Sequence, residues 1–118
     1  TNLHADVLSD LAAALSGSIG VAPTANLNPG RATPSMFEPI HGSAFDITGK
    51  GIANPVGTFW SAAMLLEHIG EAEAAAQLMQ AIDVVTANQD SHTPDLGGNA
   101  TTEKVTTALI ARIQGRND

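Results

Sequence analysis

Apolar residues recur every three or four positions in four stretches of this chain, which is the period of a helix with one apolar face. The predicted helices cover residues 3–15, 55–69, 71–88 and 102–114. Asn54 can cap an exposed backbone N–H, and Pro55 suits the first helical position. Gly17 and Gly70 follow two of these stretches as stop signals, so the helix boundaries agree with the periodicity.

The predicted apolar faces are mainly aliphatic. They consist of Leu3, Val7, Leu8, Leu11, Ala14 and Leu15, then Phe59, Ala62, Ala63, Leu66 and Ile69, then Ala75, Leu78, Ile82 and Val85, and finally Val105, Leu109 and Ile113. Aromatic residues make up only 3% of the chain and Tyr is absent, so we expect a core of Ala, Leu, Ile and Val in which helices pack closely. A length of 118 residues with 43% apolar content predicts one domain.

Short segments and turns separate the first helix from the second. Residues 19–27 and 35–40 are brief and contain Gly or Pro, which predicts strands or extended segments around a turn at 28–30. Residues 41–54 mix apolar and polar positions with several glycines, which is typical of a shaped functional loop. Residues 90–99 form a polar connection. The pattern as a whole predicts a helix-rich α/β unit with short strands.

The charge balance excludes some classes of partner. The net charge is −7 and the chain has only five Lys and Arg residues, so no basic stripe is available for nucleic acid. No apolar run is long enough to cross a membrane and no signal sequence opens the chain, so we expect a cytoplasmic protein. Cys is absent, and any metal must therefore be bound by oxygen or imidazole. Because the chain opens at Thr1, without Met, we also expect a fragment of a longer protein.

Asp6 and Asp10 stand four residues apart in the first predicted helix, so their carboxylates project from nearly the same face. Spacing alone favours a solvated acidic face, since exposed like charges cost a helix only a few tenths of a kcal/mol. The alternative is a site for Mg²⁺ or Mn²⁺, which prefer oxygen ligands. His4, His68 and His92 are scattered and form no pair typical of a zinc site.

Residues 38–47 place His41, Ser43 and Asp46 in close order beside Gly42. A loop of this kind can present backbone N–H groups to a phosphate. It contains neither the G-x-G-x-x-G pattern nor the P-loop pattern, and an isolated His or Ser in such a loop more often has a structural role. The residues alone therefore leave both a nucleotide site and a purely structural loop open.

Four motifs stand in the order found in the isocitrate and isopropylmalate dehydrogenase family, which the chain resembles over essentially its whole length. The motifs are TNLHADVLSD at residues 1–10, FEPIHGSA at 37–44, GKGIANP at 49–55 and TPDLGGNA at 93–100. Residues 19–29 and 98–102 look most like the tartrate and D-malate dehydrogenase branch. The resemblance implies the C-terminal portion of an isopropylmalate dehydrogenase-like α/β/α fold, with a metal-bearing helix at 1–17 and a cofactor-binding portion at 18–118.

The resemblance also assigns roles to individual residues. It implies that Asp6 and Asp10 bind a divalent metal, Mg²⁺ or Mn²⁺, which reverses the interpretation from spacing alone. The residues that it assigns to NAD are His41, Gly42, Ser43, Ala44, Asp46, Ile47 and Asn54, with Glu38 toward the nicotinamide and Asp95 toward the adenosine. Asp46 and Ile47 are expected to favour NAD over NADP, because a carboxylate can accept from a ribose 2′-OH and repels a 2′-phosphate.

The function implied by the resemblance is the NAD-dependent oxidation of a (2R)-hydroxy dicarboxylic acid, such as tartrate or D-malate, with β-decarboxylation, in a homodimer. The family also uses a Lys base, a Tyr acid, an Arg cluster and a third metal Asp from a second subunit, and none of these can be assigned here. Lys50 falls in the cofactor loop and Lys104 in the last predicted helix. We therefore expect the isolated chain to be inactive. The alternatives are a truncated noncatalytic α/β module with residual nucleotide or metal binding, and a parent that is 3-isopropylmalate dehydrogenase.

Overall fold

The computed structural model describes residues 3–115, and all four predicted helices are confirmed with boundaries within two residues of those expected. The helices are α1 (Leu3–Leu15), α2 (Val56–Ile69), α3 (Ala72–Ala87) and α4 (Thr102–Ile113), and the strands are β1 (Pro23–Asn26) and β2 (Met36–Pro39). Thr1 and Asn2, which open the first family motif, lie outside the described residues. The predicted class, a helix-rich α/β fold with short strands, is confirmed.

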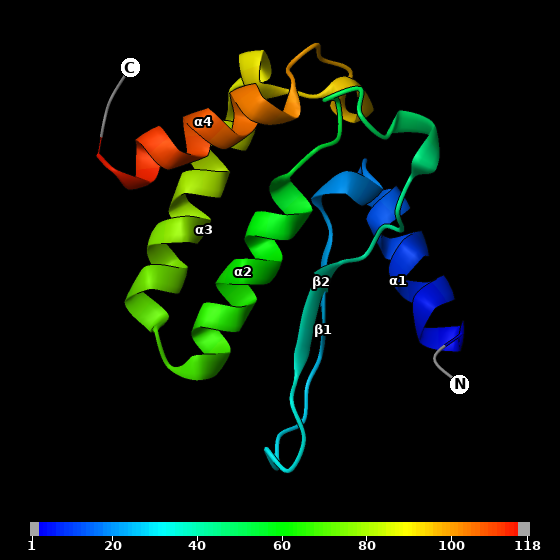
Figure 1. Cartoon of the computed structure of the whole chain (residues 1–118), viewed down its shortest axis with the longest axis vertical. Helices are drawn as coiled ribbons and strands as arrows, with labels where there is room; N and C mark the ends of the chain where they lie inside the picture. The colour runs from blue at the N-terminus through cyan, green and yellow to red at the C-terminus, as the bar shows by residue number, and fades with distance from the viewer. Residues whose placement is uncertain (1–2, 116–118) are drawn as a thin grey trace.

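β1 and β2 form an antiparallel hairpin that lies along α2 (Figure 1). Pro23 pairs with Pro39 at one end, and Asn26 pairs with Met36 at the end nearer the turn. The turn reaches the C-terminal end of α2, where the Arg31 guanidinium donates to the His68 carbonyl oxygen at 3.1 Å. The hairpin is therefore fixed to one side of the central helix.

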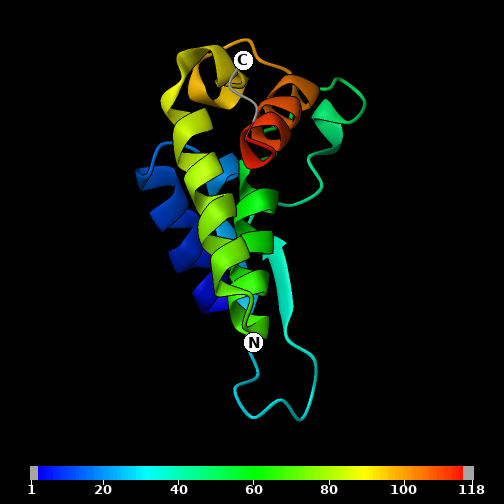
Figure 2. The same ribbon diagram turned by 90° about the vertical axis from the view of Figure 1, so that its left-hand side faces the viewer.

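The core lies among α2, α3 and α4, and Figure 2 shows α3 running along α2. The faces predicted for α3 and α4 are confirmed, and Val105 and Leu109 of α4 are almost fully buried. Ala63 and Ala81 are buried where α2 meets α3, and their small side chains let the two backbones approach closely. A core of small aliphatic residues is what the composition predicts.

The ends of α2 follow the predicted signals. The Asn54 side-chain oxygen accepts from the Val56 backbone N–H at 3.0 Å. At the other end Gly70 adopts a left-handed conformation with φ 97°, and its N–H donates to the last carbonyl groups of the helix. Asn54 therefore joins the loop that precedes it to the first turn of α2.

Two of the predicted apolar faces differ from expectation. Although α1 is helical as predicted, its large apolar residues are 56–81% exposed and Ala13 is its buried residue. The reason is that α1 packs mainly on the Ile19–Val21 turn and lies apart from the three-helix layer (Figure 1). In α2, Ala62 and Ile69 are exposed, because the helix is buried on two sides, by α3 and by the hairpin.

Candidate functional site

The loop between β2 and α2 surrounds a cavity of about 640 Å³, which we call the loop cavity. Seven of the residues assigned to NAD line it: His41, Gly42, Ser43, Ala44, Ile47, Asn54 and Asp95. Its other walls come from Ile19 and Gly20, from Pro94 and from Thr102. The volume lies within the range of ordinary small-molecule sites. Residues that are far apart in the sequence are thus brought together around one cavity.

The backbone of this loop is unusual at several positions. Ala44 has φ 43°, a left-handed conformation that is uncommon for a residue with a side chain, and Gly49 and Gly51 have φ 77° and 66°. The first turn of α4 holds the end of the loop, since the Thr102 N–H donates to the Gly51 carbonyl at 2.9 Å and its hydroxyl to the Ala53 carbonyl at 2.5 Å. The loop therefore has a defined shape.

Asp46 lies in the short 3₁₀ turn Phe45–Ile47 and its side chain is exposed. The nearby residues Ala44 and Ile47 line the loop cavity, but Asp46 itself does not. The residue that is expected to choose between NAD and NADP thus stands beside the cavity rather than in its wall.

A second cavity, of about 380 Å³, contains the predicted metal acids, and we call it the acidic cavity. Asp6 and Asp10 enter it from α1, and Glu38 enters it from β2, where Glu38 pairs with Thr24 of β1. Glu38 is therefore grouped with the two Asp residues rather than with the loop. Within residues 3–115, no set of three or more His, Cys, Asp or Glu side chains is arranged to hold a metal ion. A metal at Asp6 and Asp10 would need further oxygen ligands from water, substrate or another chain segment.

Adjacent residues of the chain line the two cavities. Ile40 lines the acidic cavity and His41 lines the loop cavity. The Ile40 N–H donates to the Ala22 carbonyl at 3.1 Å, which extends the hairpin up to this junction. The chain thus passes directly from the wall of one cavity to the wall of the other.

The carboxylate of Asp95 connects three segments around the loop cavity. Its Oδ2 accepts from the Ser18 hydroxyl and from Asn54 Nδ2, the latter at 3.0 Å, and its Oδ1 accepts from the Thr93 hydroxyl at 2.5 Å. Partial burial alone raises the pKa of Asp95, but these three bonds and one from its own backbone outweigh it and hold the pKa below the usual value. Asp95 is therefore ionised at neutral pH.

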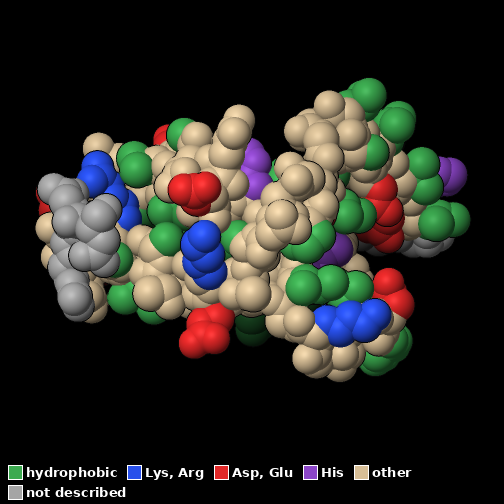
Figure 3. Space-filling model, turned by 90° about the horizontal axis from the view of Figure 1, so that it is seen from above, with side chains coloured by type: hydrophobic (Ala, Val, Ile, Leu, Met, Phe, Trp, Pro, Cys, Tyr) green, Lys and Arg blue, Asp and Glu red, His purple; other side chains and the backbone are tan. Residues whose placement is uncertain are grey.

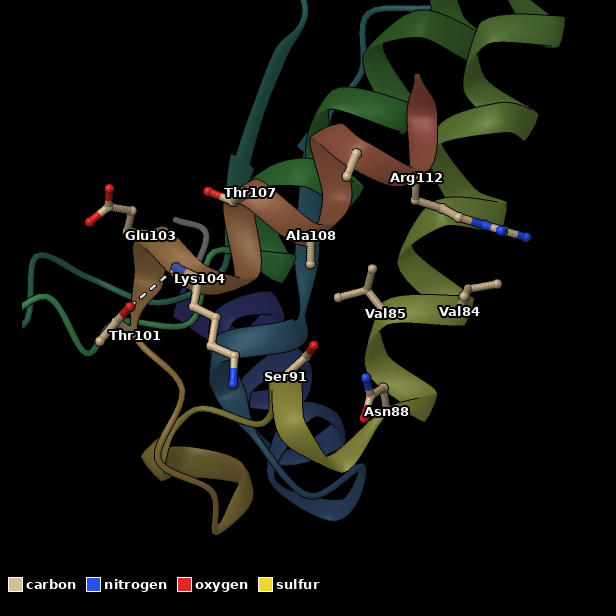
Figure 4. A pocket seen from close by; sticks show the side chains of 11 residues that line it. Val84, Val85, Asn88, Ser91, Thr101, Glu103, Lys104, Thr107, Ala108 and Arg112 are labelled. Carbon is tan, nitrogen blue, oxygen red and sulfur yellow. Dashed lines mark hydrogen bonds between the residues drawn. The ribbon is translucent and has the colours of Figure 1, made fainter. Parts of the chain in front are cut away.

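A third cavity, of about 660 Å³, is a groove between α3 and α4 that contains none of the predicted site residues. Val85 and Ala108 line its apolar part, and Lys104 extends its side chain toward Ser91, whereas Arg112 points away (Figure 4).

The face of the molecule in Figure 3 carries acidic and basic side chains scattered singly among apolar and neutral groups.

The sequence did not identify several residues in the walls of these cavities. Ile19, Gly20 and Thr102 reach the loop cavity, and Thr24 and Asn26 reach the acidic cavity. No local pattern assigns them to a cavity, because each is brought there by packing between elements distant in the sequence. Thr102 is the second residue after the TPDLGGNA motif, and its position at a predicted helix start was the available signal.

Solved dehydrogenases share this architecture. An isocitrate dehydrogenase from Methylococcus capsulatus superposes with a TM-score of 0.85 at 41% identity, over 95% of this chain and 32% of its own. A β-decarboxylating dehydrogenase from Thermococcus kodakarensis superposes with a TM-score of 0.83 at 45% identity, over 97% of this chain and 32% of its own. The fold is therefore that of a dehydrogenase segment.

The sequence comparisons define the family. The sequence model of the isocitrate/isopropylmalate dehydrogenase family matches residues 1–111, and this chain belongs to that family. A probable tartrate dehydrogenase/decarboxylase of Agrobacterium vitis is 66% identical over 99% of the chain. An isocitrate/homoisocitrate dehydrogenase of Thermus thermophilus is 51% identical over 97% of the chain. The chain spans about a third of the length of these relatives, 32% and 33% respectively.

In the described part of the chain, no helix has the length and apolar character of a membrane span.

Proposed function

We propose that this chain is the cofactor- and metal-binding C-terminal part of an NAD-dependent dehydrogenase that oxidises a (2R)-hydroxy dicarboxylic acid, with β-decarboxylation. The observation that carries the proposal is that the chain passes directly from the wall of the acidic cavity, at Ile40, to the wall of the loop cavity, at His41. This arrangement suits a dinucleotide whose reactive end approaches a substrate beside the acids. The name of the 66% identical relative supports tartrate as the substrate, with D-malate as a close analogue.

Asp6 and Asp10 are the proposed ligands of Mg²⁺ or Mn²⁺. Both carboxylates line one cavity from the same helix, and they supply the hard oxygen atoms that these ions prefer. When bound, the ion would stabilise negative charge on the substrate oxygen during oxidation and decarboxylation. Glu38 lines the same cavity and adds negative charge near this site. These residues fit a divalent cation that is also coordinated by water and substrate.

The NAD site is proposed to follow the loop cavity. Gly42 and the left-handed Ala44 shape the loop, and Asp46 stands beside the cavity, where its carboxylate would accept from a ribose 2′-OH. The same negative charge would repel a 2′-phosphate, which supports NAD over NADP.

The acid–base groups are proposed to lie outside this chain. The chain has no Tyr, while Lys50 lies in the cofactor loop and Lys104 beside the α3–α4 groove. A third metal ligand is proposed to come from a second subunit of a cytoplasmic homodimer. The exposed apolar side of α1 supports contact with further protein in the parent, because apolar residues such as Leu8 and Leu11 are otherwise 68% and 56% exposed.

A specific observation favours a second candidate substrate. The relative that is 51% identical is named an isocitrate/homoisocitrate dehydrogenase, so isocitrate or homoisocitrate is the second candidate substrate after tartrate and D-malate.

The proposed function is tested by steady-state kinetics of the full-length parent with D-malate, the tartrates, isocitrate and 3-isopropylmalate, each with NAD⁺ and with NADP⁺. We expect the highest kcat/KM with NAD⁺ and with D-malate or a tartrate. A clear preference for NADP⁺, or no turnover of any of these acids, would refute the proposal.

A further inference from the structure

The hydrogen bonds around Asp95 fill most of its capacity to bind anything else. An ionised carboxylate offers about four acceptor positions. Three are used by Ser18, Asn54 and Thr93, and the backbone N–H of Asp95 also contributes. Little capacity is left for a ligand hydroxyl or amine. Although Asp95 lines the loop cavity, its bonding is directed into the protein.

We infer that Asp95 is a positioning residue for the cofactor: its carboxylate sets the orientation of the Asn54 amide and ties together three walls of the loop cavity. The bonding partners of Asp95 stand in or next to these walls, since Ser18 precedes Ile19, Asn54 is itself a lining residue and Thr93 precedes Pro94. The inference rests on the proposed function, because it concerns the site proposed for NAD.

The Asn54 amide has a single orientation that satisfies both of its neighbours. The Val56 N–H can only donate and therefore faces Oδ1, at 3.0 Å. The ionised Asp95 can only accept and therefore faces Nδ2, also at 3.0 Å. Turning the amide over would place two donors against each other and two acceptors against each other. Because Asn54 is only 8% exposed, water cannot easily replace these partners.

The space around the pair is also filled. A side chain added at Gly20 would place its Cβ 2.9 Å from Asp95 Oδ2 and 3.0 Å from Asn54 Cβ. The absence of a side chain at Gly20 therefore lets the turn at residues 19–21 close against both residues. Packing and hydrogen bonding act together to hold Asp95 and Asn54 in one arrangement.

The choice of substitution separates positioning from charge. Asp95→Ala removes every side-chain bond. Asp95→Asn keeps one carbonyl oxygen, which can accept from Asn54, while its NH₂ can donate to the Thr93 hydroxyl, because a hydroxyl can rotate and accept. Asp95→Asn is therefore expected to rescue much of what Asp95→Ala loses. Asp90 offers a matched control, since it is an exposed Asp in the same polar connection and lines none of the described cavities.

The experiment uses the ¹⁵N-labelled chain without nucleotide and then with NAD⁺. The side-chain NH₂ resonance of Asn54, assigned with Asn54→Ala, is recorded for wild type, Asp95→Ala, Asp95→Asn and Asp90→Ala. We expect Asp95→Ala to move this resonance toward that of a free amide and to raise the Kd for NAD⁺ about tenfold, equivalent to about 1.4 kcal/mol. Asp95→Asn should stay within about threefold of wild type, since it retains the bond to Asn54, and Asp90→Ala should change neither value.

Two outcomes overturn the inference. One is an Asn54 resonance that Asp95→Ala leaves unchanged, and the other is a folded Asp95→Ala variant with wild-type NAD⁺ affinity. If Asp95→Ala does not fold, the inference is overturned instead by an Asp95→Asn variant in which the Asn54 side-chain resonance is that of a free amide. Failure of the proposed function is recognised separately: the wild-type chain then binds no NAD⁺, while the nucleotide-free spectra still report whether Asp95 orients Asn54.

Discussion

Gly20 and Gly42 line the same cavity, but only Gly20 is crowded, and this contrast yields a quantitative prediction. A Cβ at Gly20 would lie 2.9 Å from Asp95 Oδ2, 3.0 Å from Asn54 Cβ and 3.3 Å from Ser18 Oγ. Each of these groups belongs to the bonded cluster, so none can move without weakening a hydrogen bond. A Cβ at Gly42 would meet no atom within 4 Å.

The expected magnitude follows from two opposing terms. Replacing Gly by Ala stabilises a protein by about 0.4–1 kcal/mol through the unfolded state, where the backbone conformation allows it. Inserting a methyl group into filled space costs about 1–3 kcal/mol. Neither glycine has a positive φ, so the first term applies to both variants and cancels in their comparison. Gly20→Ala should therefore be about 1–3 kcal/mol less stable than Gly42→Ala.

Urea unfolding measures this difference directly. The single Trp, Trp60 in α2, provides the fluorescence signal, and far-UV circular dichroism provides a second probe. With a slope of about 1.5 kcal/mol per molar urea, the two midpoints should differ by about 0.7–2 M. Equal midpoints and equal slopes for the two variants would mean that the Ser18–Asn54–Asp95 cluster accommodates the added methyl group without loss of stability, which would refute the reasoning.

Four further predictions can be checked separately. Asp46→Lys in the full-length parent should raise the KM for NAD⁺ and lower that for NADP⁺, and an unchanged ratio of kcat/KM would remove Asp46 from cofactor selection. Because the folded pKa of Asp95 is lowered, its stabilising contribution is present above the unfolded-state value of about 3.9 and is lost as the pH falls through the folded pKa. Asp95→Asn should therefore lose less thermal stability than wild type in acid, as calorimetry between neutral and acidic pH would reveal. Leu109→Ala should lower the free energy of unfolding by about 2–5 kcal/mol and Ile110→Ala by about 1 or less, because Leu109 is fully buried and Ile110 is 46% exposed; similar losses would contradict the described core. The isolated chain should form no NADH from D-malate or tartrate with NAD⁺ and Mn²⁺, and measurable turnover would show that it carries its own acid–base groups.

The helices were predictable because their signals are local. The apolar period, Asn54 at the start of α2 and Gly70 at its end all act within a few residues, and the structure reproduces each of them. Burial is harder to predict than helix position, because a periodic apolar face indicates that it packs against another element but does not identify that element. In α1 that face is exposed within residues 3–115, because the elements of this chain cover little of it.

The candidate site was predictable to the extent that its residues are consecutive. Most residues of the loop from His41 to Asn54 line one cavity, and the Asp6 and Asp10 pair shares a helix face. The contacts of Asp95 could not be foreseen in this way. Its bond with Ser18 joins residues 77 positions apart, and such a pairing depends on how the whole chain packs.

The proposed metal and cofactor chemistry is tested most directly by NADH formation in the full-length parent. The absorbance at 340 nm is followed with D-malate or tartrate and NAD⁺, before and after chelation of divalent ions and again after addition of Mn²⁺. We predict that chelation abolishes NADH formation and that Mn²⁺ restores it, with Asp6→Asn and Asp10→Asn variants inactive in all three conditions. NADH formation that persists after chelation, or that both variants retain, would contradict a metal-dependent dehydrogenase built on these two acids.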